Sequence, residues 1–284
     1  MKKVIVTGCN GQLGRAFNRV MEDNTEYSLV NTDVGELDIT DIEKVMALAR
    51  EVKPCAILNC AAHTNVNGCE TDRDGAFMIN AIGARNLSIA AQETGAKMIQ
   101  ISTDYVFSGN GDKPYREFDP VDPMSAYGST KLQGEVFVRD LCSRYFILRT
   151  AWLYGEGNNF VKTMLRLSET NDKVQVVQDQ YGTPTYAMEL AKAVAYLLPT
   201  DNYGIFHATC EGECSWAAFA REIFRLAGKS TAVEGITTQE YEEKFPGQAH
   251  RPAYSVLDNY MFERTTDFRF ASWETAIAEY VKTL

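Results

Sequence analysis

A glycine-rich loop near the start of the chain constrains the fold more than any other feature of the sequence. The loop Gly8–Gly14 carries glycines at positions 8, 11 and 14, and it follows the β-branched apolar run Val4–Thr7. Glycines between a strand and a helix let backbone N–H groups approach a pyrophosphate at the helix N-terminus, where the helix dipole favours negative charge. The loop could otherwise be a plain tight turn. Its position predicts a dinucleotide site formed by Gly8, Gly11, Gln12, Leu13 and Gly14.

The residues up to about 151 alternate between short apolar runs and helix-like stretches. Further strands are predicted at 28–32, 56–60, 97–101 and 145–149, and helices at 12–21, 42–52, 74–93 and 127–141. Apolar strands that alternate with helices are typical of a parallel sheet that is covered on both faces. The sequence therefore predicts an α/β protein with a Rossmann-type doubly wound parallel sheet.

Beyond residue 152 the regular alternation ends. Loop-like stretches separate helices that are predicted at 160–169, 188–198, 215–227 and 272–283. We therefore predict a dinucleotide-binding core at residues 1–151. Residues 152–284 are predicted to form a smaller, mixed α/β region that mainly binds substrate, with segments that return to the core sheet.

The composition narrows the classes of function. Of the 284 residues 45% are hydrophobic, which fits a globular protein with a sizeable core, and a net charge of -10 disfavours nucleic-acid binding. No apolar run reaches the roughly 18 residues of a membrane span, and the N-terminal run is too short for a signal peptide. Cys210, Cys214 and His207 are too few for a metal site. These features predict a cytoplasmic protein with reduced thiols and no metal, membrane or nucleic-acid partner.

Polar residues after the second and third predicted strands extend the predicted cofactor site. Asp33 ends the second strand, where a carboxylate can bond ribose hydroxyls and disfavours a 2′-phosphate, although a turn-forming Asp is the alternative. No basic residue follows it directly, which favours NADH without excluding NADPH. Asp38 and Ile39 are expected to flank the adenine. The residues after the third strand are expected to line the cofactor, namely Ala62, His63, which could equally be an ordinary loop histidine, and Thr64.

A tyrosine and a lysine one helical turn apart are the predicted catalytic pair. Tyr127 and Lys131 are spaced i, i+4, so both lie on one face of the predicted helix. A nearby ammonium and a cationic nicotinamide favour the phenolate and should lower the pKa of the tyrosine toward the range of a useful proton donor. Thr103 follows the strand 97–101 and is expected to orient the carbonyl oxygen of a substrate, with Ser102 as the alternative. Asp104 is expected to contact sugar hydroxyls.

These motifs together resemble the extended short-chain dehydrogenase/reductase superfamily, and within it the dTDP-4-dehydrorhamnose reductase family. The narrower resemblance is carried by Asn59–Thr64, Ile101–Phe107, Arg149–Tyr154, Gln178–Thr185 and Arg251–Pro252, which span nearly the whole chain. The resemblance implies that NADPH or NADH reduces C4 of dTDP-4-dehydro-β-L-rhamnose to give dTDP-L-rhamnose.

The resemblance also assigns roles to individual positions. The family's cofactor contacts match Gly11, Gln12, Leu13, Asp33, Asp38, Ile39, Ala62, His63, Thr64, Tyr127 and Lys131. The family's sugar-facing positions match Thr103, Asp104, Tyr127 and Trp152. The indole of Trp152 offers a flat apolar face for a sugar ring, against the alternative of core packing after a strand. Arg251 could pair with a diphosphate, or serve as a structural arginine.

Two alternative functions stay open from the sequence. A nucleotide-sugar epimerase or dehydratase would use the same scaffold, although no Glu follows Asp104 as dehydratases usually require. A non-catalytic protein resembling the regulatory β subunit of methionine adenosyltransferase would also share the fold.

Some members of the family dimerise through a metal that is held partly by an acidic residue just past the glycine loop, but this stretch is Arg15–Phe17 here. We therefore expect a monomer or a metal-independent homodimer.

Overall fold

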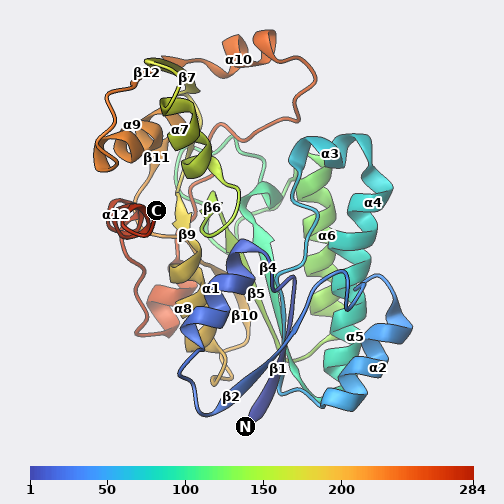
Figure 1. The fold of residues 1–284 in the computed structure, drawn as a ribbon. Helices are drawn as coiled ribbons and strands as arrows, with labels where there is room; N and C mark the ends of the chain where they lie inside the picture. The colour runs from blue at the N-terminus through green and yellow to red at the C-terminus, as the bar shows by residue number, and fades with distance from the viewer.

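The computed structural model describes all residues from 1 to 284, and a six-stranded parallel sheet forms its centre (Figure 1). The sheet order is β10 (Gly204–His207), β5 (Tyr145–Thr150), β4 (Lys97–Thr103), β3 (Ala56–Asn59), β1 (Lys2–Thr7) and β2 (Tyr27–Thr32). The chain passes from β1 to the edge strand β2 and then crosses back over β1 to β3 on its other side. This reversal opens a crevice at the carboxyl ends of β1 and β3. The predicted doubly wound fold is confirmed.

Helices cover both faces of the sheet, as the apolar strands require. One face packs against α1 (Gln12–Val20) and α8 (Ala187–Leu197), and the other packs against α2 (Ile42–Val52), α5 (Ala84–Thr94) and α6 (Ala126–Leu141) (Figure 1). Side chains of β1 alternate between the two cores, so that Val4 and Val6 lie with Phe17 while Ile5 lies on the opposite face. Burial on both faces explains why these strands read as continuous apolar runs.

Local capping fixes where several helices begin. The Asp41 side chain accepts a hydrogen bond from the backbone of Lys44 at the start of α2, and Ser125 accepts one from Gly128 at the start of α6. The predicted helix 127–141 therefore begins one residue earlier, at Ala126.

The predicted helix at 74–93 is found, but its middle turn is π-helical and not α-helical. The structure has α4 (Arg73–Phe77), a π-helical turn η1 (Met78–Gly83) and then α5. The extra residue of the π turn places the Asn80 amide on the Thr130 hydroxyl of α6, with a donor–acceptor distance of 3.1 Å. This hydrogen bond joins segments 50 residues apart, so the local periodicity of the sequence does not record the π turn.

Residues beyond 152 contribute to two parts of the molecule. Strand β10, helix α8 and helix α11 (Tyr260–Thr265) pack with the central sheet. A separate core of buried aromatic and aliphatic residues joins α7 (Phe160–Ser168), α9 (Trp216–Leu226) and α12 (Trp273–Val281) above the sheet (Figure 1). The remaining elements there are β6 (Leu153–Tyr154), β7 (Lys173–Val177), β8 (Tyr181–Gly182), β9 (Thr185–Tyr186), β11 (Cys214–Ser215), β12 (Ala232–Ile236) and α10 (Thr238–Lys244). None of the helices is both long and apolar enough to cross a membrane.

Candidate active site

A cleft of about 660 Å³ lies between the carboxyl edge of the sheet and the upper aromatic core. It gathers most of the residues that the sequence singled out, although they come from all parts of the chain. These are Gly11, Gln12, Leu13, Ala62, Thr64, Ser102, Thr103, Asp104, Tyr127, Lys131, Trp152 and Arg251.

Six predicted site residues do not line this cleft. Gly8 and Gly14 lie beneath the loop, where each packs against neighbouring backbone. Asp38 is exposed and accepts hydrogen bonds from Thr40, and the Ile39 side chain is buried against Gly83. The His63 ring lies 3.0 Å from the Cys69 sulfur, which matches the reading of an ordinary loop histidine. Asp33 is the sixth.

The glycine loop has the shape that a pyrophosphate requires. Gly8 has a φ of 62°, and a side chain there would meet the backbone of Cys60 and Ala61 at 2.7–2.8 Å. Gly11 occupies the cap position of α1 without any side-chain hydrogen bond, unlike the side-chain caps of α2 and α6. The first backbone N–H groups of α1 are therefore left for an anionic ligand in the cleft. These features fit a bound dinucleotide.

Asp33 lies at the outer end of the loop. One carboxylate oxygen accepts a hydrogen bond from the backbone N–H of Asn10 at 3.1 Å, and the other accepts one from Val34 at 2.8 Å. The side chain thus ties the glycine loop to the end of β2, and this holds the loop in place whether or not Asp33 also bonds a ribose.

Helix α6 presents Tyr127 and Lys131 to the cleft. The Lys131 ammonium donates a hydrogen bond of 2.6 Å to the Ile101 carbonyl in β4. The ring of Tyr127 packs edge-on against Tyr105, with centroids 5.5 Å apart. Gly128 allows this approach, because a side chain there would overlap the Tyr105 carbonyl. Helix and strand together bring the predicted pair to the glycine loop.

Burial controls the pKa values of this pair. Burial lowers the pKa of Lys131 to about 8, against the opposing effect of the Glu135 carboxylate. Burial raises the pKa of Tyr127 above its ordinary value, and Thr103 opposes this only in part. The predicted lowering of the Tyr127 pKa relied on a cationic nicotinamide as well as the ammonium, and in the chain by itself desolvation is the largest effect on this phenol. A protonated phenol next to a charged lysine is suited to donate a proton.

Two neighbouring polar residues end β4 beside the pair. Thr103 donates a hydrogen bond of 2.8 Å to Asp104, whose second oxygen is buried without a partner. Burial raises the pKa of Asp104 to about 6, so that this carboxyl is near its protonation point at neutral pH. The alternative hydroxyl, Ser102, donates to Glu135 at 2.6 Å, away from Tyr127. The Thr103 hydroxyl also has a partner in Asp104, but it is the one that interacts with the Tyr127 phenol.

The indole of Trp152 lines the cleft, but one of its faces is covered by another ring. Trp216 stacks on it with ring centroids 3.4 Å apart, and Gly182 packs against its ring atoms. Trp152 also has a φ of 47°, which is unusual for a bulky residue and implies local strain. The cleft wall is therefore a pair of stacked tryptophans, continued by Phe160 next to Trp216.

Arg251 reaches the cleft from the loop that precedes α11. Its guanidinium donates a hydrogen bond of 3.3 Å to the Tyr105 hydroxyl. This contact is long, so that the guanidinium keeps donors for an anionic group of a ligand.

Sequence reasoning missed three residues of this region. Trp216 lies on α9 and Asn80 on the π turn, and neither belongs to a motif near the catalytic pair. Glu135 is the one that the sequence could have indicated, because it follows Lys131 at i+4 on the same helix face. Their contacts join distant segments, which no local pattern records.

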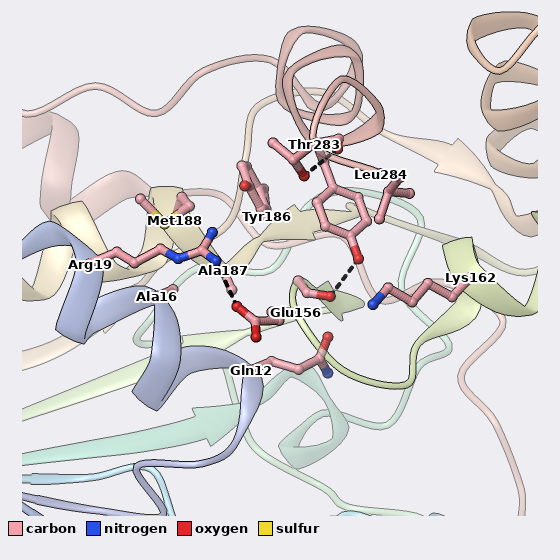
Figure 2. A pocket seen from close by; sticks show the side chains of 12 residues that line it. Gln12, Ala16, Arg19, Glu156, Lys162, Tyr186, Ala187, Met188, Thr283 and Leu284 are labelled. Atoms are coloured by element: carbon pink, nitrogen blue, oxygen red, sulfur yellow. Dashed lines mark hydrogen bonds and ion pairs between the residues drawn. The ribbon is translucent and has the colours of Figure 1, made fainter.

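A smaller pocket of about 190 Å³ lies on the far side of Gln12 (Figure 2). Figure 2 shows Arg19 paired with Glu156. The Tyr280 hydroxyl, which also lines this pocket, donates to the Gly155 carbonyl. Arg15 also pairs with Glu156, at 2.7 Å. The stretch just past the glycine loop is thus engaged in ion pairs within the chain.

Comparison with known proteins adds an independent line of support. The model of a family described as "RmlD substrate binding domain" matches residues 1–284. A Bacillus subtilis spore coat polysaccharide biosynthesis protein is 41% identical, covering 99% of this chain and 98% of its own. The crystal structure of a Clostridium acetobutylicum dTDP-4-dehydrorhamnose reductase is 50% identical, with a TM-score of 0.95 and 99% of both chains covered. A Bacillus anthracis dTDP-4-dehydrorhamnose reductase in complex with NADP is 41% identical, with a TM-score of 0.96 and all of both chains covered.

Proposed function

Since this chain belongs to the RmlD substrate binding domain family along its whole length, we propose that it is the NAD(P)H-dependent reductase of that family. It reduces the C4 keto group of dTDP-4-dehydro-β-L-rhamnose and yields dTDP-L-rhamnose. One observation carries the proposal: Tyr127, Lys131 and Thr103 meet in the cleft that the glycine loop borders.

The residues of the chain divide the chemistry among them. The reduced nicotinamide supplies the hydride when it is bound. Tyr127 donates its phenolic proton to the C4 oxygen as negative charge develops there. Thr103 hydrogen-bonds the same oxygen and orients it toward the phenol. Lys131 remains charged, holds a ribose hydroxyl and stabilises the phenolate that the proton transfer leaves behind.

The substrate occupies the upper part of the cleft. Asp104 bonds the sugar hydroxyls with its unpartnered oxygen. Arg251 pairs with the diphosphate, because its guanidinium has free donors and phosphate favours a planar fork. Residues 152–284 supply most of this substrate wall, and residues 1–151 supply the cofactor site.

The remaining properties are part of the same proposal. The substrate is a dTDP-linked deoxysugar, and we propose a cytoplasmic enzyme without nucleic-acid or membrane partners. Arg15 and Arg19 engage Glu156 within one chain. This favours a monomer or a homodimer that needs no metal.

A direct assay tests the proposed reaction. The purified chain is mixed with NADPH or NADH and dTDP-4-dehydrorhamnose, and loss of the reduced-nicotinamide absorbance is followed together with the sugar product. We expect stoichiometric oxidation of cofactor and formation of dTDP-L-rhamnose. An epimerase or dehydratase would convert the sugar without net consumption of cofactor, and a regulatory protein would convert nothing. Either result would overturn the proposal.

The alkaline limb of the pH profile of kcat/KM should report deprotonation of the Lys131 ammonium. Because burial lowers its pKa to about 8, the ammonium is present below that pH and is lost above it. We expect kcat/KM for NADPH to be constant up to about pH 8 and then to fall about tenfold per pH unit. Initial rates between pH 6 and 10 measure this. A profile that stays flat to pH 10 would contradict the role of the charge.

The stacked tryptophans should matter for the sugar nucleotide and not for the cofactor. We expect Trp216→Ala to raise KM for the nucleotide sugar about tenfold, because loss of the stacked ring frees Trp152 to move. The Kd for NADPH should stay within about twofold, since Trp216 belongs to α9 in the upper aromatic core and not to the glycine loop. Phe245→Ala removes an exposed aromatic residue outside the cleft and serves as the control. An unchanged KM would remove Trp216 from the substrate wall.

A further inference from the structure

A buried ion pair lies directly beneath the catalytic lysine, and the proposed chemistry does not use it. Arg149 of β5 donates to both carboxylate oxygens of Glu135, at 2.9 and 2.7 Å. The side chains are only 3% and 1% exposed. Burying two charges is costly, and a buried pair contributes little stability compared with apolar packing. Its place in the fold therefore calls for a role other than stability.

The carboxylate of this pair is linked to the catalytic lysine through β4. Lys131 and Glu135 lie one turn apart on α6, and they bind adjacent residues of that strand. Lys131 donates to the Ile101 carbonyl, and Glu135 accepts from the Ser102 hydroxyl, both at 2.6 Å. The next residue along the strand is Thr103. Glu135 thus holds the strand segment that positions both the ammonium and the catalytic hydroxyl.

The titratable and charged groups around the Lys131 ammonium come from several elements. On α6 these are Tyr127 and Glu135, and after β3 there is the Cys60 thiol. On β5 there is the Arg149 guanidinium, which lies on the far side of Glu135. Burial lowers the pKa of Lys131, the Glu135 carboxylate opposes this most strongly, and Cys60 opposes it less. Glu135 is therefore the main anion that counteracts desolvation of the ammonium.

Arg149 partners both oxygens of that carboxylate. Two hydrogen bonds from one planar guanidinium give the buried pair a fixed, bidentate geometry. The guanidinium is itself fixed, since it donates to the Glu117 carbonyl at 3.2 Å and lies 5.1 Å from the Phe107 ring centroid. The ion pair is thus a rigid support.

We propose that Glu135 is a positioning residue that keeps Lys131 charged and, through Ser102, aligns the end of β4 with the catalytic pair. The inference rests on the proposed function, because it assigns the support of that reaction's lysine. It predicts that the charge of Glu135 matters more than its shape.

Two single substitutions separate charge from shape. Glu135→Gln keeps the size of the side chain and removes its charge. Glu135→Asp keeps the charge and shortens the side chain. We expect the alkaline limb of kcat/KM for NADPH to move about one pH unit or more toward acid in Glu135→Gln, and to stay in place in Glu135→Asp. A purely structural role would lower kcat in both variants without moving either limb.

A paired substitution covers the case in which Glu135→Gln fails to fold with Arg149 left unpaired. Glu135→Gln combined with Arg149→Met removes both buried charges, so that no unpaired charge remains in the interior. Its alkaline limb should also move toward acid, by less than in the single variant, because the cation is gone as well. An unmoved limb in a folded paired variant would overturn the inference.

A second readout needs neither cofactor nor substrate. Lys131 of the free protein is acetylated with a trace of acetic anhydride over pH 6–10, and the labelled peptide is quantified by mass spectrometry. The pH midpoint of labelling reports loss of the ammonium, and we expect it to fall by about one unit in Glu135→Gln. If the midpoint falls but the wild-type chain reduces no sugar, the proposed function fails and the support of Lys131 stands. If the wild type is active and the midpoint is unchanged, the support role fails alone.

Discussion

Replacing Tyr127 by Phe should lower kcat roughly a hundredfold or more while leaving the Kd for NADPH within about twofold. The substitution removes a single oxygen from a ring that packs edge-on against Tyr105, so that the packing survives. Without the phenol, the developing charge on the C4 oxygen keeps only the Thr103 hydroxyl beside it. Steady-state kinetics with dTDP-4-dehydrorhamnose and a fluorescence titration with NADPH measure the two quantities separately.

The matched control is Tyr105→Phe, which removes a hydroxyl from the neighbouring ring of the same pair. That hydroxyl accepts from Arg251, so its loss should raise KM for the nucleotide sugar and change kcat little. Equal losses of kcat in the two variants would show that ring hydroxyls serve a shared structural purpose. Unchanged turnover in Tyr127→Phe would remove Tyr127 from the mechanism.

Replacing Gly8 by Val should abolish measurable NADPH binding and destabilise the fold by on the order of 2–4 kcal/mol. Gly8 has a φ of 62°, which a β-branched residue tolerates poorly. A Cβ there would also lie 2.7–2.8 Å from backbone atoms of Cys60 and Ala61. Backbone cannot move aside as a side chain can, so the loop must shift away from the pyrophosphate. Isothermal titration and urea unfolding measure the two effects.

Gly35→Val is the control for this substitution. Gly35 lies in the turn after β2, its φ is not in the left-handed region, and nothing lies within 4 Å of a Cβ built there. We expect its stability and its Kd for NADPH to match the wild type. Wild-type binding by Gly8→Val would mean that the loop does not contact the cofactor.

Much of the fold was predictable because its signals are local. The strand runs, the helix periodicity and the glycine loop each depend on residues within a few positions of one another. The four helices predicted beyond residue 152 also lie within one or two residues of α7, α8, α9 and α12. Short helices such as α3 (Val66–Thr71) and α10 were missed, since six or seven residues carry too little periodicity.

The candidate site likewise has features that local sequence predicts and features that depend on tertiary contacts. The sequence by itself determined that Tyr127 and Lys131 share a helix face, because 3.6 residues per turn dictate it. Only the tertiary structure decided that Trp216 stacks on Trp152, that Asp104 keeps an unpartnered oxygen, and that burial raises the pKa of Tyr127. Those outcomes depend on desolvation and on contacts between segments far apart in the chain. Neither is recorded in the spacing of residues along it.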